Sequence, residues 1–264
     1  MSTLSQQQDS KPFIHLIDCP SGECFLGSDD HHANEKPRHK IKLSYSFQIA
    51  QTPVTQSQWM QLMPKNPSHF LGDLRPVDSV TWLDCIDFCN RLSQREGLET
   101  CYKISDQKVI WHKSANGYRL PTEAEWAYAA YANEAVIYAG QEPLKQIAWF
   151  GENEFLDDQA PQTHEVMLKS PNAWGIYDMS GNVWEWCHDQ FTLFDQSRNL
   201  EDRTLKPIEN PVYWSDDLQC NRVLKGGCYW NLAKSCRIST RSQDDAMVTH
   251  DGRGFRVLRA VMTH

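Results

Sequence analysis

The pattern of apolar and polar positions predicts three helices, each beginning at a capping box. Residues 55–58, 81–84 and 122–125 each begin with Thr and carry Gln, Asp or Glu in the fourth position, so side chains can satisfy the free amides of a first turn. The first helix must end before Pro64. In the second, apolar residues recur at positions 82, 83, 86, 89 and 92, up to Gly97. This second helix is therefore predicted to be amphipathic and to face a core.

Short strands are predicted around these helices. Two strand-like runs within residues 13–25 are joined by a Pro-Ser-Gly turn, and two runs that flank Ser105-Asp106 predict a hairpin. Other strand-like segments are 41–43, 183–186, 221–227 and 254–258. Residues 1–11 are polar and predict a disordered tail, whereas 131–170 and 188–220 predict irregular structure. The pattern is that of a mixed α+β chain, rich in loops, with short antiparallel strands and about three helices.

Composition narrows the range of partners. The 264 residues suffice for one large domain or two small ones, and ten Trp spread from position 59 to 230 favour a single aromatic core. The net charge of −8 leaves no basic stripe, which argues against nucleic acid as a partner. Without an apolar run of about 18 residues we expect no membrane span. The N-terminus lacks the apolar core of a signal peptide, so we expect a cytoplasmic protein.

Most of the polar clusters favour structural roles. The nine cysteines form an odd set without a C-x-x-C pair, so most are expected to be buried thiols. Residues 29–39 collect several Asp, Glu and His, but their spacing does not enforce a metal site. Glu123 and Glu125 are two positions apart on a helix, so their side chains point roughly 200° apart. They therefore cannot act together as a catalytic acid and base on the same substrate bond.

The stretch 171–187 carries the first chemical hypothesis. Gly181-Asn182 is a tight-turn signal, and the following residues alternate like a strand with large aromatic side chains. Asp178 and Glu185 bracket the turn, so their carboxylates can converge with the backbone carbonyls of Gly181 and Val183 on calcium. In the alternative interpretation, Asp178 caps the turn and Glu185 is a solvated strand residue.

The same stretch, Asn-Ala-Trp-Gly-Ile-Tyr-Asp-Met-Ser-Gly-Asn-Val-Trp-Glu-Trp, resembles a signature of the formylglycine-generating (sulfatase-modifying factor) domain family. Further similar motifs lie at residues 27–43, 118–126, 222–227 and 254–256, so the resemblance covers about residues 23–260 and implies one domain over 12–264. The resemblance implies a variant of the C-type lectin fold, with Arg119 as a buried anchor. It also implies calcium at Asp178, Gly181, Val183 and Glu185.

The copper site of the family's oxidases is incomplete in this sequence. Their copper lies between two cysteines that follow a Gly-Gly-Ser motif, and thiolates select Cu(I). Counting forward from Gly226-Gly227 places these positions at Asn231 and Cys236, whereas counting back from residues 254–256 places them at Cys228 and Ala233. The expected serine is Cys228, and an expected asparagine is Gly252. The resemblance is therefore to a divergent member that lacks the catalytic cysteine pair.

Two functions follow as expectations. The first is a calcium-stabilised scaffold whose C-terminal surface binds a protein or peptide, as in related variable proteins diversified by retroelements. Candidate residues on that surface are Tyr229, Trp230, Asn231, Lys234 and His250, since rigid aromatics with polar neighbours suit recognition. A simpler alternative is that Trp230 only fills the core. The second function is a copper-dependent thiol oxidase that uses Cys228, Cys236 or both.

Overall fold

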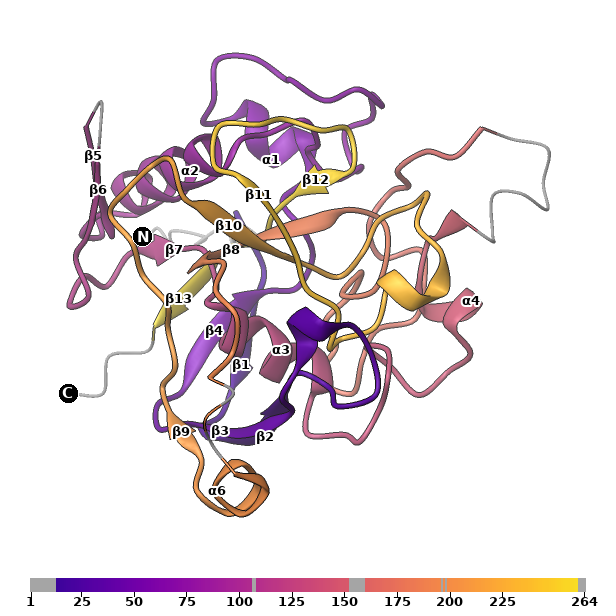
Figure 1. Cartoon of the computed structure of the whole chain (residues 1–264). Coiled ribbons are helices and arrows are strands. Elements are labelled where there is room, and N and C mark those ends of the chain that lie inside the picture. The colour runs from indigo at the N-terminus through magenta and orange to yellow at the C-terminus, as the bar shows by residue number, and fades with distance from the viewer. Residues whose placement is uncertain (1–12, 106–107, 152–159, 196, 198, 261–264) are drawn as a thin grey trace, which may run out of the picture.

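All three predicted helices are present and begin where the capping boxes place them. The computed structural model describes residues 13–105, 108–151, 160–195, 197 and 199–260, so the expected tail 1–11 lies outside it. Helices α1 (Gln56–Met60), α2 (Trp82–Arg95) and α3 (Glu123–Tyr131) follow Thr caps whose side chains accept from the amide three residues on (Figure 1). None of the described helices is both long and apolar enough to span a bilayer.

Two further short helices were not predicted. Helix α4 (Leu144–Ile147) lies in the region expected to be irregular, and α6 (Leu200–Leu205) lies in the expected 188–220 loop. No residue of α6 is buried. Its sequence therefore lacks the apolar stripe that predicts an amphipathic helix. Its start is set by Asn199, whose side chain accepts from the Asp202 amide.

The strands form small sheets that join distant parts of the chain. One sheet has the order β1 (Leu16–Cys19), β4 (Phe47–Ala50), β13 (Leu258–Ala260), β7 (Tyr118–Arg119), and the central sheet β11 (Ser242–Asp245), β10 (Asn221–Lys225), β8 (Trp184–Gln190), β12 (Arg253–Gly254). A third comprises β2 (Gly22–Leu26), β3 (His39–Leu43) and β9 (Ile208–Glu209), and the predicted hairpin is β5 (Tyr102–Ile104) with β6 (Val109–Trp111). Most pairs are antiparallel as expected, but β8–β12 and β3–β9 are parallel.

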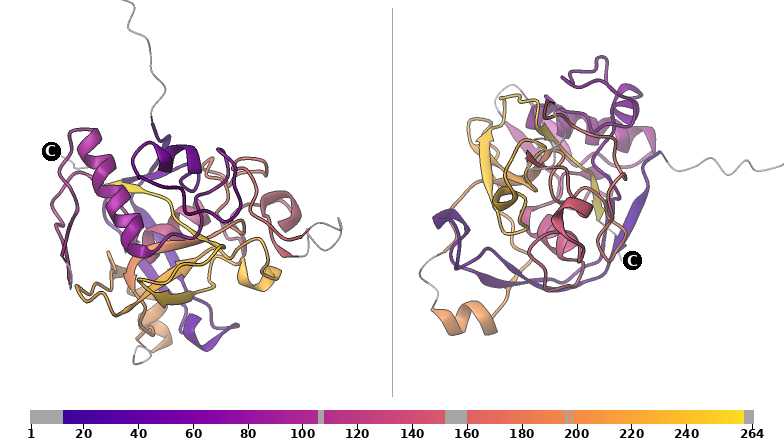
Figure 2. Two further views of the ribbon diagram at one scale, coloured as in Figure 1. Left: turned by 90° about the horizontal axis from the view of Figure 1, so that it is seen from above. Right: turned by 90° about the vertical axis from the view of Figure 1, so that its right-hand side faces the viewer.

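The central sheet lies between two apolar clusters. Because side chains alternate along a strand, Trp186 and Leu224 enter the cluster against α2, whereas Cys187 and Val223 enter the cluster against α3. Trp186 is fully buried, as are the tryptophans that begin α2 and lie within α3. The left view of Figure 2 shows the long helix α2 along one side of the molecule. The tryptophans do form the core, but the prediction of a single aromatic core is wrong in that the sheet divides it into two clusters.

Four buried glutamates each pair with an arginine. The pairs, with the shortest nitrogen–oxygen distance, are Glu35–Arg237 at 2.8 Å, Glu123–Arg241 at 2.6 Å, Glu125–Arg119 at 2.6 Å and Glu185–Arg256 at 2.7 Å. Glu123 and Glu125 thus point to different partners, as their spacing predicts, and Arg119 is the expected buried anchor. Charge-assisted, mostly bidentate bonds of this kind fix the geometry of the loops that carry them.

Candidate functional site

The central Gly-Asn turn is built by close backbone contact. At Gly181, φ is +81°, and an added Cβ would lie 2.1 Å from the Trp149 carbonyl oxygen, so only glycine fits. Asn182 also has positive φ, and its side chain both accepts from and donates to the backbone of His164. The turn therefore joins β8 to two loops that precede it in the chain.

The carboxylates that bracket this turn are already engaged. Asp178 accepts from the Met167 amide and the Asn182 side chain, and burial raises the pKa of Asp178. Both oxygens of Glu185 accept from Arg256 at 2.7 Å, and the Trp126 indole also donates to one of them. No group of three or more His, Cys, Asp or Glu that could hold a metal occurs within the described ranges.

Asp178, Gly181, Val183 and Glu185 are not arranged as an open calcium cage. Arg256 supplies the positive charge next to Glu185, so a cation at this turn would have to share that carboxylate with Arg256. Calcium binding at these four positions stays a prediction of the resemblance.

Calcium removal tests this directly. We expect the same melting temperature in EDTA and in millimolar calcium, because a ligand that does not bind the native state cannot stabilise it. The measurement is thermal unfolding of the wild-type protein and of Asp178→Ala in both buffers. A rise with calcium that disappears in Asp178→Ala would show that the cage forms after all.

The two candidate cysteines are buried thiols. Cys228 and Cys236 are both fully buried, and all nine cysteines of the chain are free. The Cys228 thiol donates to the Asn231 side chain at 3.1 Å. Burial raises its pKa well above the ordinary value, and the proximity of Cys236 raises it further. A buried protonated thiol is a poor copper ligand and a poor nucleophile.

The Trp230 ring lies against Gly252, which also adjoins the Cys228 sulfur. A Cβ built on Gly252 would lie 2.3 Å from the Trp230 ring and 3.0 Å from the Cys228 sulfur. A larger side chain at position 252, such as the asparagine that the family pattern places there, would therefore collide with this ring. The small glycine at 252 leaves the room that the Trp230 ring fills.

Five aromatic residues from three distant segments form an aromatic strip, defined as His69, Phe70, Tyr229, Trp230 and His250. Consecutive ring centroids lie 4.6, 5.2, 4.7 and 4.8 Å apart. Both histidines are exposed, Phe70 and Trp230 are half-buried, and Tyr229 is buried. Figure 1 shows the loop after α1 and the segment between β11 and β12 at the same end of the molecule.

The strip includes Tyr229, Trp230 and His250 of the five surface residues proposed from the sequence, but Tyr229 is buried and was wrongly placed on the surface. Asn231 instead accepts from the Cys228 amide and thiol, and Lys234 is exposed on the neighbouring turn. His69 and Phe70 were missed because they follow a polar Asn-Pro-Ser turn that carries no signal for a site. The exposed apolar residues on the same segments are Leu71, Leu232, Met247 and Val248.

Comparisons with known proteins agree with the motifs. Residues 2–261 match the model of the sulfatase-modifying factor enzyme 1-like domain. The chaperone protein LppX of Paenibacillus barcinonensis is 33% identical over 244 residues, which are 81% of this chain and 80% of the relative. The formylglycine-generating enzyme of Mycobacterium tuberculosis is 27% identical over 90% of this chain and 95% of its own.

Among solved structures, the Treponema denticola variable protein 1 is similar, with a TM-score of 0.78 and 30% identity. The match covers 92% of this chain and 94% of that protein. The fold, the turn at Gly181-Asn182 and the matched span lead to one conclusion: the chain belongs to the formylglycine-generating enzyme-like, or sulfatase-modifying factor, domain family, with its C-type-lectin-like fold.

Proposed function

We propose that this protein is a scaffold of the sulfatase-modifying factor family that binds a protein or peptide through the aromatic strip. The observation that carries the proposal is the position of Trp230, whose ring occupies the space above Gly252 and Cys228. Trp230 thus occupies a place next to the buried Cys228, and the same half-buried ring offers an aromatic surface.

The composition of the strip suits recognition of another chain. Half-buried aromatic rings give a large contact area at low conformational cost, and such residues dominate binding energy at protein interfaces. Leu71 and Met247, on two segments that contribute to the strip, are 73% and 56% exposed, so apolar surface accompanies the rings. Among the relatives, one is named a chaperone protein and one solved structure a variable protein, and neither name describes an oxidase.

A copper-dependent thiol oxidase remains the second candidate. It is favoured by one observation, the proximity of Cys236 to Cys228 inside the same loop. Two neighbouring thiols could hold Cu(I) if both lost their protons and Trp230 moved aside.

Peptide selection tests the binding proposal. Peptides selected from a random display library on the wild-type protein are expected to lose about tenfold or more in affinity for Trp230→Ala, the range of an interface hot spot. The matched control is Leu205→Ala, which removes an exposed apolar side chain from α6. Selected peptides that bind both variants equally well would contradict the role of the strip.

Copper titration decides between the two candidates. We expect no tight Cu(I) binding by wild-type protein under reducing conditions, measured by competition with a chromogenic chelator. Tight binding that is lost in both Cys228→Ser and Cys236→Ser would favour the oxidase and overturn the scaffold.

A further inference from the structure

A cavity that shares no residue with the aromatic strip lies elsewhere in the molecule. The cavity has a volume of about 440 Å³, which is in the range of small-molecule sites. Its walls come from the segment between β6 and β7, from the residues after β9, and from the ends of the first sheet. The lining residues that matter for binding are Tyr45, Trp111, Lys113, Arg119, Pro211 and Val212.

One wall is apolar and held firmly in place. Trp111 lines the cavity, and its ring also packs against His188, with centroids 4.3 Å apart, and against Trp214 at 5.9 Å. Burial lowers the pKa of His188 well below its ordinary value, so this support is uncharged at neutral pH. Pro211 and Val212 extend the apolar surface. A flat ring could therefore enter without reorganising the wall.

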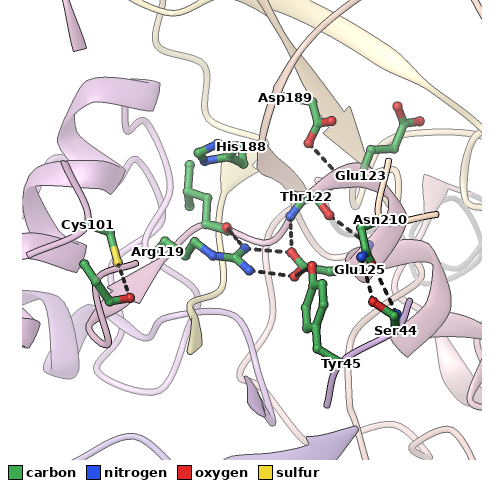
Figure 3. A network of polar contacts seen from close by, with 12 residues as sticks. Ser44, Tyr45, Cys101, Arg119, Thr122, Glu123, Glu125, His188, Asp189 and Asn210 are labelled. Carbon is green, nitrogen blue, oxygen red and sulfur yellow. Dashed lines mark hydrogen bonds and ion pairs between the residues drawn. The ribbon is translucent and has the colours of Figure 1, made fainter. Parts of the chain in front are cut away.

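The polar side of the cavity is held in place by the buried ion pair between Arg119 and Glu125. Figure 3 shows the Arg119 guanidinium facing the Glu125 carboxylate, with the Tyr45 hydroxyl beside it. Arg119 donates to both oxygens of Glu125 at 2.6 and 2.7 Å, and Tyr45 donates to one of them at 2.7 Å. Glu125 is fully buried behind these two side chains, and its negative charge is balanced by Arg119. The cavity therefore contains no free carboxylate from Glu125.

One cation of the lining is not paired with a carboxylate of the site. The lining contains Lys113 and Arg119 and no carboxylate, and the charge of Arg119 is balanced by Glu125. Lys113 is exposed, and its ammonium lies 5.1 Å from the centroid of the Trp111 ring. Within the part of the chain that the structure describes, Lys113 forms no ion pair. A ligand anion would thus meet an available cation next to an aromatic surface.

We propose that this cavity binds a small organic anion with a flat apolar body, of the aromatic carboxylate class. The ring lies against Trp111 and the Pro211-Val212 wall, and the carboxylate faces Lys113. This site is independent of the protein-binding strip, so the two proposals can fail separately.

Three probes of one shape test the chemistry. We expect 2-naphthoate to bind with 1:1 stoichiometry in isothermal titration calorimetry and to raise the melting temperature. The neutral 2-naphthamide and the cationic 2-naphthylmethylamine are expected to bind at least about fivefold more weakly, because only the carboxylate pairs with Lys113. Equal binding of all three probes, or no binding of 2-naphthoate at millimolar concentration, would overturn the proposal.

Two variants locate the site. Lys113→Glu is expected to weaken 2-naphthoate binding about fivefold or more, whereas Lys103→Glu, the same charge change on exposed strand β5, should leave it unchanged. Val212→Trp fills the cavity and is expected to abolish binding, with circular dichroism to show that the variant is folded. If Lys113→Glu and Lys103→Glu weaken binding equally, the anion binds elsewhere and the assignment is wrong.

Discussion

Replacing Arg256 with Met is expected to lower the free energy of unfolding by about 3–5 kcal/mol, the cost of leaving one partner of a buried ion pair alone. Glu185 and Arg256 are both fully buried, and Arg256 also donates to the backbone carbonyls of Ala50 and Tyr177. The variant leaves an uncompensated carboxylate beneath the central turn. Urea unfolding at neutral pH measures the loss.

The control uses a solvent-exposed ion pair, Arg91 with Asp87, whose side chains are 46% and 38% exposed. Arg91→Met breaks this pair and should cost less than about 1 kcal/mol. Adding Glu185→Leu to Arg256→Met removes the stranded charge and should recover part of the lost stability. If Arg256→Met were as stable as the wild-type protein, Arg256 could not be the group that neutralises Glu185.

Helix starts could be predicted from the sequence because a capping box is a local signal. Thr55, Thr81 and Thr122 each bond within four residues, and no tertiary contact has to be known. Strand pairing is different, since β1 and β2 are separated by one turn yet enter different sheets. Local sequence patterns predict where the strands lie in the chain, but they do not predict which strands pair with one another.

The buried ion pairs likewise could be predicted from the sequence only where both partners lie close together in the chain. Arg119 and Glu125 are six residues apart within one motif, and the anchor role of Arg119 was predicted. Glu185 and Arg256 are 71 residues apart, and the sequence pattern left Glu185 open to either calcium or solvent. Only the three-dimensional structure places Arg256 against Glu185.

Only the part of the aromatic strip that is continuous in the sequence pattern could be predicted. Tyr229, Trp230 and His250 stand between two recognisable glycine motifs, so their segment could be identified from its flanks. Phe70 joins them from a segment about 160 residues earlier in the chain, through a ring contact that has no sequence signature. The packing of Trp230 against Gly252, next to Cys228, cannot be found by counting residues along the sequence.

The second large effect is expected at Glu123, which holds two buried cations. Its carboxylate accepts from Arg241 at 2.6 and 2.8 Å and lies 3.6 Å from Lys225, and both cations are buried. Glu123→Gln leaves both cations without a negative partner and should cost about 3–5 kcal/mol at pH 7. Arg241 follows the loop that carries Trp230, so peptide binding by the strip should weaken as well.

The loss should depend on pH in a defined direction. Burial alone would raise the pKa of Glu123, but Arg241 and Lys225 hold it below the ordinary value of 4.5. A carboxylate whose pKa is lower in the folded state stabilises the protein above its unfolded pKa, and this stabilisation is lost as pH falls through the folded value. The difference between wild type and Glu123→Gln should therefore be constant above pH 5 and shrink below about pH 4.5. Urea unfolding from pH 7 to pH 3 measures it, with Glu209→Gln, from an exposed pair with Lys42, as the control. A difference that stays the same down to pH 3 would show that the ionic charge of Glu123 is not what holds Arg241 and Lys225 in place.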